Sequence, residues 1–391
     1  MRINNKYVVE NIIFISYVLF AMAWVGGTAS MQQIMNEMKI SSLASASFIS
    51  GAVTLAKILG TFVSAWVAIK VGIKYAFFIA GLLISIGVIT PLVNNYELLL
   101  ISRFLMGIGG AFMVVYFNPI VMKFFSVKER ATINGINAVA FNVGTAIIMW
   151  TMVDINLVTG SWKTSLILFS LGSLLLSVIW LFVQYGDVNE VDKTNDTTTS
   201  KPIDNYSYGI GFKDKFNWVY ALGYSGLLAL YICLFTFYPK AGISQSKWVI
   251  AFGIFGTFAG IIYSKRFVMR IPVIRFSGFI ISLTILGMSF SSNIMLQTIF
   301  AMILGFFLFF PVTALVSIPH ELPKMTIQRM TVVFSLFYSI SYSVATIVLW
   351  GFGKLVDMNN GDFTPSFLLI CLVSWSLFVG SFFLPETQEN S

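Results

Sequence analysis

The sequence predicts an all-α membrane protein whose twelve transmembrane helices form two pseudo-symmetric bundles of six. Two observations predict this class. Of the 391 residues, 57% are hydrophobic and 10% are charged, whereas soluble domains carry about 25% charged residues. The apolar residues are gathered into runs long enough to cross the hydrocarbon core of a bilayer, which takes roughly 20 residues. One polar interruption divides these runs into two sets.

The predicted spans end at charged residues, Asn or Pro. They cover residues 8–32, 45–69, 74–94, 98–122, 132–153 and 163–184, followed by 217–238, 247–264, 271–290, 294–318, 328–352 and 364–384. The run that starts at Val8 is too long for the apolar core of a signal peptide, so we interpret it as the first span. The predicted bundles are therefore residues 1–185 and 217–391.

Residues 186–216 form the polar interruption. They are rich in Asp, Asn, Thr and Ser and hold too few apolar residues to pack a core. We interpret this segment as a cytoplasmic linker between the two bundles.

Lys and Arg are concentrated in alternate loops, which predicts the orientation of the chain because cytoplasmic loops carry an excess of both residues. With the N-terminus inside, the cytoplasmic side receives Arg2, Lys6, Lys70, Lys74, Lys123, Lys128, Arg130, Lys193, Lys201, Lys213, Lys215, Lys265, Arg266, Arg270, Arg275, Lys324 and Arg329. The outer side receives Lys39, Lys163, Lys240, Lys247 and Lys354. We therefore predict a multi-pass protein of the cell membrane with both termini in the cytoplasm.

Composition also narrows the function class. The formal net charge of +8 comes from scattered loop residues rather than from a basic domain, so no nucleic-acid partner is expected. Cys233 and Cys371 lie within apolar runs without metal-ligand spacing, and we expect neither metal nor cofactor. A lipid bilayer and a small-molecule substrate are the expected partners, and a monomer is the expected state.

An internal repeat relates the two bundles. Gly60-Thr61-Phe62 precedes Lys70 in the second span, and Gly256-Thr257-Phe258 precedes Arg266 in the eighth at the same offset. Arg130-Ala-Thr at the start of span five is likewise echoed by Arg329-Met-Thr at the start of span eleven. Such repeats are typical of transporters, in which the two halves surround a central cavity.

The chain resembles the major facilitator superfamily over essentially its whole length. Arg103-Phe-Leu-Met-Gly107-Ile-Gly-Gly110 is similar to the family's RxxxGxG signature, and residues 124–135 are similar to its loop between spans four and five. The family's GxxxDRxGRR loop is matched poorly, because Ile69 stands at the acidic position and Ala65 at the first Gly. The resemblance implies a major facilitator fold in which spans one, four, seven and ten line the cavity.

The fifth span bears on the branch of the family. The run from Gly135 to Gly144 contains Asn137 and Asn142 and is similar to span five of nitrate, nitrite and cyanate porters. The arginine pair that nitrate porters carry in spans two and eight is missing. The drug-exporter branch carries a Gly-Pro signature in span five, and this chain has no Pro there.

Lys57 is the principal candidate for solute recognition. It lies about 12 residues from either end of span two, roughly 18 Å from each face at 1.5 Å per residue. A charge at this depth costs roughly 2.5 to 3.5 kcal/mol on insertion scales and usually has a function. We expect it to bind an anionic group of the solute; the alternative is a Lys that contacts helix carbonyls or lines water.

Four further residues are candidates for gating or coupling. The resemblance implies such a role for Arg103, which could equally hydrogen-bond carbonyl groups, and for Arg130 in the loop after span four. Glu10 lies at the inner mouth of span one, and the sole histidine, His320, lies at the inner end of span ten beside Glu321. Both can also be interpreted as interface residues.

Polar and aromatic residues near the middle of the membrane complete the candidate binding site. They are Trp24, Asn118, Asn142, Tyr224, Tyr231 and Tyr342, with Asn137 and Ser339 as further candidates. Tyr224 and Tyr231 are seven residues apart and therefore share one helix face. Pro119 and Pro311 are expected to bend or break spans four and ten.

These observations favour a secondary active or facilitative transporter of a small polar solute, one that bears a carboxylate or other anionic group. Uptake of an amino acid or other zwitterion and efflux of a drug or metabolite are the alternatives. An enzyme is not expected, because the spans do not supply convergent catalytic groups. A receptor would need a folded soluble domain, which neither the linker nor the tails could form.

Overall fold

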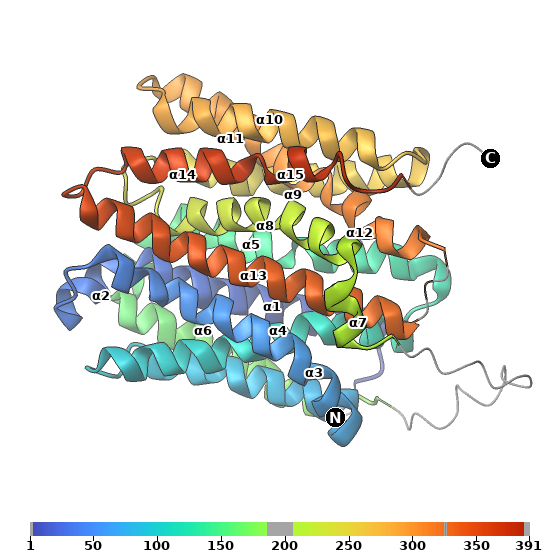
Figure 1. The fold of residues 1–391 in the computed structure, drawn as a ribbon. Coiled ribbons are helices and arrows are strands. Elements are labelled where there is room, and N and C mark those ends of the chain that lie inside the picture. Colours follow the sequence, from blue (N-terminus) through green and yellow to red (C-terminus); the bar gives the residue numbers. More distant parts are fainter. Residues whose placement is uncertain (1–2, 186–205, 324, 326, 387–391) are drawn as a thin grey trace, which may run out of the picture.

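A computed structural model describes residues 3–185, 206–323, 325 and 327–386. The described chain is helical, and its long helices run side by side along one axis (Figure 1). Both ends of the chain lie at one end of this bundle, which we call the terminal face; the other end, which carries α2, is the opposite face. Residues 186–205 of the predicted linker, with Arg2, Lys193, Lys201 and Lys324, lie outside the described residues, whereas residues 206–216 of it are described and include the short helix α7 (Tyr208–Lys213).

The helices of the first half end where capping residues occur. They are α1 (Lys6–Ala29), α2 (Met31–Met38), α3 (Leu43–Ser85), the 3-10 helix η1 (Ile86–Ile89), α4 (Tyr96–Phe124), α5 (Val127–Thr159) and α6 (Trp162–Leu181). The side chains of Asn5, Ser42, Asn95 and Ser161 each accept a backbone hydrogen bond at a helix start. These caps satisfy amide groups that have no partner within the helix.

The second half follows residue 205. Its helices are α7 (Tyr208–Lys213), α8 (Lys215–Thr236), α9 (Ser246–Arg266), α10 (Ile271–Phe290), α11 (Ile294–Phe309), α12 (Val312–Glu321), α13 (Ile327–Met358), α14 (Thr364–Ser374) and α15 (Ser376–Gly380). The short α7 packs on α13, where Gly211 meets Val332 and Leu336.

Two predicted breaks are present in the structure, and a third residue leaves its helix continuous. Gly72 has φ 78° and ψ 154°, so α3 is in fact two helices joined by a sharp turn at the predicted end of span two. Pro311 separates α11 from α12, as a proline within a span can do. Pro119 lies inside α4, which continues to Phe124.

Among the described residues, eleven helical segments are long and apolar enough to cross a membrane. The twelfth predicted span, residues 364–384, is shorter than expected, because its helical part runs from Thr364 to Gly380 and is interrupted at Trp375. At 1.5 Å per residue it is still about 25 Å long. The all-helical membrane fold predicted from the sequence is confirmed, with this last segment the least regular.

Close helix packing explains the glycines of span four. A Cβ atom at Gly107 would lie 2.7 Å from the Cβ of Ala56, and one at Gly110 would lie 2.1 Å from the ring of Phe20. Small residues permit this close approach. Within a bilayer the hydrophobic effect does not drive helices together, so they associate through such close packing.

Two seams join the halves. Along the first, α3 packs on α13, and the Thr54 and Thr346 hydroxyls are 2.6 Å apart. Along the second, α5 packs on α9, and the rings of Trp150 and Trp248 meet edge to face at 4.6 Å between centroids.

Candidate functional site

Lys57 lies inside the bundle at the boundary between the two halves. It is about 15 residues from the Ser42 cap and about 15 from the Gly72 break, or roughly 22 Å from each. Its relative exposure is 5%. The ammonium nitrogen donates hydrogen bonds to the hydroxyls of Tyr17 and Tyr342, each at 3.3 Å. Tyr342 belongs to α13, so the second half contributes directly to the surroundings of this charge.

Five aromatic rings surround the Lys57 ammonium group. Their centroids lie 5.1 to 5.8 Å from the nitrogen, and the rings are those of Tyr17, Phe20, Trp24, Phe141 and Tyr342. We call this set the Lys57 cage. Ring faces attract cations by about 0.5 to 2 kcal/mol each, more strongly where water is excluded. The cage thus stabilises a buried positive charge without neutralising it.

Lys57 differs from most buried cations in the charges around it. Among the residues that the structure describes, no carboxylate lies within salt-bridge distance of Lys57. Buried charges are normally paired, because an isolated ion loses its hydration. The Lys57 ammonium group therefore has hydroxyl and ring partners but no anionic partner among the described residues.

Polar groups beside the cage are held in place by one another. Trp24 donates its indole hydrogen to the Ser50 hydroxyl at 2.9 Å. Tyr231 donates to the side-chain oxygen of Asn142 at 2.7 Å, and its ring lies 6.2 Å from that of Phe141. The structure thus brings Lys57, Trp24 and Tyr342 into one cluster, with Asn142 and Tyr231 beside it.

Two predicted binding residues lie elsewhere. Tyr224 stacks on Phe337 at 4.8 Å between centroids, nearer the terminal face than the cage. Asn118 is exposed on α4, on the same helical stripe as the exposed Val114 and Met122.

Three of the five rings of the cage, those of Tyr17, Phe20 and Phe141, are not among the binding residues predicted from the sequence. A pattern in the sequence points to Tyr17, because it precedes Trp24 by seven residues and shares its helix face, the same spacing that relates Tyr224 and Tyr231.

Arg103 holds three helices together. Its guanidinium group donates to the carbonyl of Trp24 at 2.8 Å and to the carbonyl of Ile49, and the side chain is 1% exposed. Gly27 leaves the room for it, because a Cβ there would lie 2.1 Å from a guanidinium nitrogen. Arg103 is thus bound to helix carbonyls of α1 and α3, one of them the carbonyl of a cage residue.

Glu10 is a buried carboxylate between α1 and α5. It is 7% exposed and lies beside the amide of Asn137, which is 3% exposed. Neither side chain makes a well-formed hydrogen bond with the described residues. A charged carboxylate in such a place is costly unless it is paired or protonated. Glu10 is thus a largely buried residue rather than an exposed one at the mouth of the span.

Arg130 and His320 occupy the terminal face. Arg130 donates to the carbonyls of Phe125 at 3.1 Å and Met122 at 2.9 Å, and so binds the C-terminal end of α4. His320 is exposed, and its ring lies 5.6 Å from that of Phe334. Neither residue contacts the Lys57 cage.

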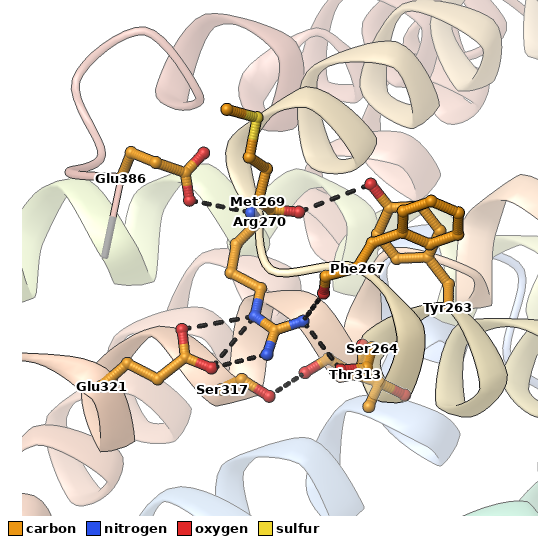
Figure 2. Close-up of polar contacts among 9 residues, drawn as sticks. All are labelled: Tyr263, Ser264, Phe267, Met269, Arg270, Thr313, Ser317, Glu321 and Glu386. Atoms are coloured by element: carbon orange, nitrogen blue, oxygen red, sulfur yellow. Dashed lines mark hydrogen bonds and ion pairs between the residues drawn. The ribbon is translucent and has the colours of Figure 1, made fainter. Parts of the chain in front are cut away.

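An ionic cluster joins α9, α10, α12 and the C-terminal segment at the terminal face (Figure 2). Arg270 donates to both carboxylate oxygens of Glu321, at 2.7 to 3.3 Å, and to the carbonyls of Ser264 and Phe267. Glu386 accepts the backbone amides of Arg270 and Ile271 at 2.8 and 3.0 Å and so caps α10. These contacts fix the loop before α10 within the second half.

Hydrogen bonds between the halves are gathered away from the terminal face. Asp357 of α13 accepts from the Ser42 hydroxyl and from the amides of Leu43 and Ala44, at 2.7 to 2.9 Å. Among the described residues, the remaining half-to-half hydrogen bonds lie at the middle of the bundle or near Lys240 on the opposite face. The opposite face is therefore the more firmly sealed end.

Comparison with known proteins places this geometry in a family. Residues 13–349 match the model of the Major Facilitator Superfamily. An uncharacterized protein of Campylobacter jejuni is 27% identical over 314 residues, which are 76% of this chain and 95% of that protein. An uncharacterized protein of Mesomycoplasma hyopneumoniae is 21% identical over 191 residues, 47% of this chain and 39% of that protein.

Solved structures show the same fold. A bacterial homologue of the human lysosomal transporter Spinster, inward-facing and unoccupied, has a TM-score of 0.69 and 14% identity, with 97% of this chain and 94% of that chain covered. The inward-facing, occupied form gives a TM-score of 0.66 and 16% identity, with 98% and 95% covered.

Proposed function

Because the chain belongs to the major facilitator superfamily, and is therefore a secondary transporter that works by alternating access, we propose that its solute is a small organic anion bound at Lys57. The observation that carries this proposal is the buried Lys57 ammonium group, which has aromatic and hydroxyl neighbours but no carboxylate partner among the described residues. A carboxylate of the solute would supply the missing charge in a charge-assisted hydrogen bond.

The position of the cage supports this role. Transporters of repeated architecture bind solute near the middle of the bilayer, at the interface between their repeats. Tyr17, Trp24 and Phe141 come from the first half and Tyr342 from the second. A solute bound to Lys57 would contact both halves, and its binding could therefore favour one arrangement of the halves over another.

The similarity of span five to nitrate, nitrite and cyanate porters also favours an anion. A zwitterionic solute such as an amino acid is the second candidate. The aromatic rings around Lys57 favour it, because ring faces also bind the ammonium group of a ligand. Efflux of a drug is less well supported, since span five has no Gly-Pro pair.

The distribution of basic residues supports a cytoplasmic terminal face. Lys6, Lys70, Lys123 and Arg266 all lie at helix ends on this side, whereas the opposite face carries few cations. Cytoplasmic loops are enriched in Lys and Arg. We therefore place both termini in the cytoplasm, with a linker between two six-helix domains, and expect the functional unit to be a monomer.

Glu10 is the proposed coupling residue. A carboxylate that is nearly buried and lacks a cationic partner among the described residues can change its charge during the cycle. Glu10→Gln should preserve counterflow while it abolishes accumulation driven by a proton gradient, whereas the exposed Glu97→Gln should preserve both. Accumulation by Glu10→Gln at the wild-type level would rule this role out.

The test of the anion site is a thermal-shift screen of the purified protein against carboxylates, inorganic anions and amino acids. An anion that stabilises the wild-type protein should lose most of its effect in Lys57→Met, which keeps the volume of the side chain and removes the charge. The control is Lys354→Met, which removes the charge of an exposed lysine near the end of α13 at the opposite face. Equal stabilisation of wild type and Lys57→Met by the same anion would overturn the proposal.

A further inference from the structure

A groove on the outer surface of the second half lies far from the Lys57 cage. It has a volume of about 680 Å³ and is formed by the start of α10 and the segment around α15. Its walls include Pro272, Arg275, Phe276, Phe279, Phe378 and Glu386. We propose that this groove binds an anionic phospholipid of the leaflet at the terminal face, with the lipid phosphate on Arg275 and an acyl chain along the phenylalanine rings.

The groove opens on the side of α10 that faces hydrocarbon. Large apolar side chains are exposed along this helix at spacings of three and four residues, namely those of Phe276, Phe279, Leu283, Leu286 and Phe290. Such a stripe on a membrane-spanning helix lies against lipid, because the polar groups of the protein are satisfied inside. The groove is therefore in contact with the lipids of the bilayer.

The depth of the groove matches the length of a lipid head and upper chain. Its polar end lies at the start of α10, where Glu386 caps the helix. Its apolar end reaches Phe279, eight residues into α10 and therefore about 12 Å deeper. A ligand that fills both ends must be polar at the membrane surface and apolar below it.

Arg275 supplies the charge that selects an anionic headgroup. Its guanidinium group is half-buried, lies 4.1 Å from the centre of the Phe382 ring, and donates long hydrogen bonds to the Ser381 hydroxyl at 3.3 Å and the Ser381 carbonyl at 3.4 Å. It forms no salt bridge with any residue that the structure describes. The planar fork of an arginine binds phosphate with two parallel hydrogen bonds.

Two acidic residues lie near the polar end of the groove. Glu386 lines it together with Arg275, and Glu321 is paired with Arg270 just before α10. Arg270 is bound to Glu321, Glu386 binds amides at the start of α10, and neither acid forms a salt bridge with Arg275. Basic pockets at this level of a membrane protein attract anionic lipid headgroups.

The test is native mass spectrometry of the purified, delipidated full-length protein with equal amounts of phosphatidylglycerol and phosphatidylcholine that have identical chains. We expect the wild type to retain phosphatidylglycerol preferentially, and Arg275→Gln to lower this preference about tenfold, the scale of one charge-assisted hydrogen bond. Arg266→Gln, which removes an exposed arginine outside the groove, is the matched control and should keep the preference.

A second variant keeps the test decisive if Arg275→Gln does not fold. Pro272→Glu places a carboxylate on an exposed wall of the groove, in the first turn of α10, where an acidic residue favours the helix. It should also reduce the preference for phosphatidylglycerol. Inorganic phosphate and glycerol 3-phosphate should not displace the lipid, because they lack the chains that fill the apolar end.

Three results would overturn the proposal. Arg275→Gln or Pro272→Glu could retain phosphatidylglycerol as the wild type does. Arg266→Gln could lose the preference equally, which would indicate attraction by surface charge alone. Inorganic phosphate could compete fully, which would indicate a phosphate site. Because the lipid site does not involve the Lys57 cage, none of these results bears on the proposed solute.

Discussion

The ammonium nitrogen of Lys57 lies 3.3 Å from the hydroxyl oxygen of Tyr342, and this hydrogen bond crosses the seam between the two halves of the protein. Lys57 belongs to α3 and Tyr342 to α13, the helices that form the first seam. A change in the charge or position of Lys57 therefore alters contacts in both halves.

Tyr342→Phe should lower the unfolding free energy by about 1 to 2 kcal/mol, because it removes an acceptor from a buried ammonium group while it keeps the ring of the cage. Thermal unfolding of the purified protein measures this change. In a Lys57→Met background the same substitution should cost much less, since the two residues interact. Tyr224→Phe, which alters a half-buried tyrosine outside the cage, should be additive with Lys57→Met. Additive effects of Tyr342→Phe and Lys57→Met would contradict the structure.

Asp357→Asn should loosen the opposite face. The carboxylate of Asp357 caps the start of α3 from the other half, and an asparagine keeps the shape but loses the charge and one of the acceptor oxygens. Spin labels at the exposed Asn36 and Asn359, one on each half, measure the distance between the halves. The distribution of this distance should broaden towards longer values. Asp362→Asn, which caps only its own segment at Thr364, should leave the distribution unchanged. An unchanged distribution in both variants would show that Asp357 does not hold the seam.

Glu129 should make the stability of the first half depend on pH in acid. Its hydrogen bond with Lys6, at 2.6 Å, and those with Ser126 lower the pKa of the Glu129 carboxyl to about 2. A lowered folded-state pKa gives stability that is complete above the usual glutamate pKa of about 4.3 and is lost as the pH falls through about 2.

The difference in unfolding temperature between wild type and Glu129→Gln should therefore be constant above about pH 5 and should shrink towards pH 2. Thermal unfolding in an acid-tolerant detergent from pH 7 to pH 3 measures it. A difference that stays constant down to pH 3 would argue against the proposed pair.

Much of the fold could be predicted from the sequence, because the bilayer imposes the length and composition of each span. The turn at Gly72 and the break at Pro311 fell where a positive φ or a missing amide demands them. The last span was less predictable, since its apolar run continues to Leu384 while its regular helix ends near Gly380. Composition sets where a helix can lie in the membrane, whereas local backbone contacts decide where it ends.

The candidate site could be predicted only in part. Lys57 was recognisable because a charge at that depth is rare, and Trp24 and Tyr342 because they combine a ring with a polar atom. Phe20 and Phe141 were not recognisable, because they are two of 38 phenylalanines and only the rotation of their helices turns them towards Lys57. The contact of Glu10 with Asn137 joins α1 to α5, and no local pattern in the sequence encodes such a pairing.

Among substitutions of the basic residues in the loops between helices, Arg270→Gln should be the most destabilising. The side chains of Arg270 and Glu321 are 9% and 15% exposed, and removal of one partner from a largely buried pair costs about 3 to 5 kcal/mol. Figure 2 shows why the loss should spread, because the same guanidinium group also binds the carbonyls of Ser264 and Phe267. Arg266→Gln removes a neighbouring exposed arginine and should change the unfolding temperature little. Equal unfolding temperatures for the two variants would mean that Arg270 contributes no more than an ordinary surface charge.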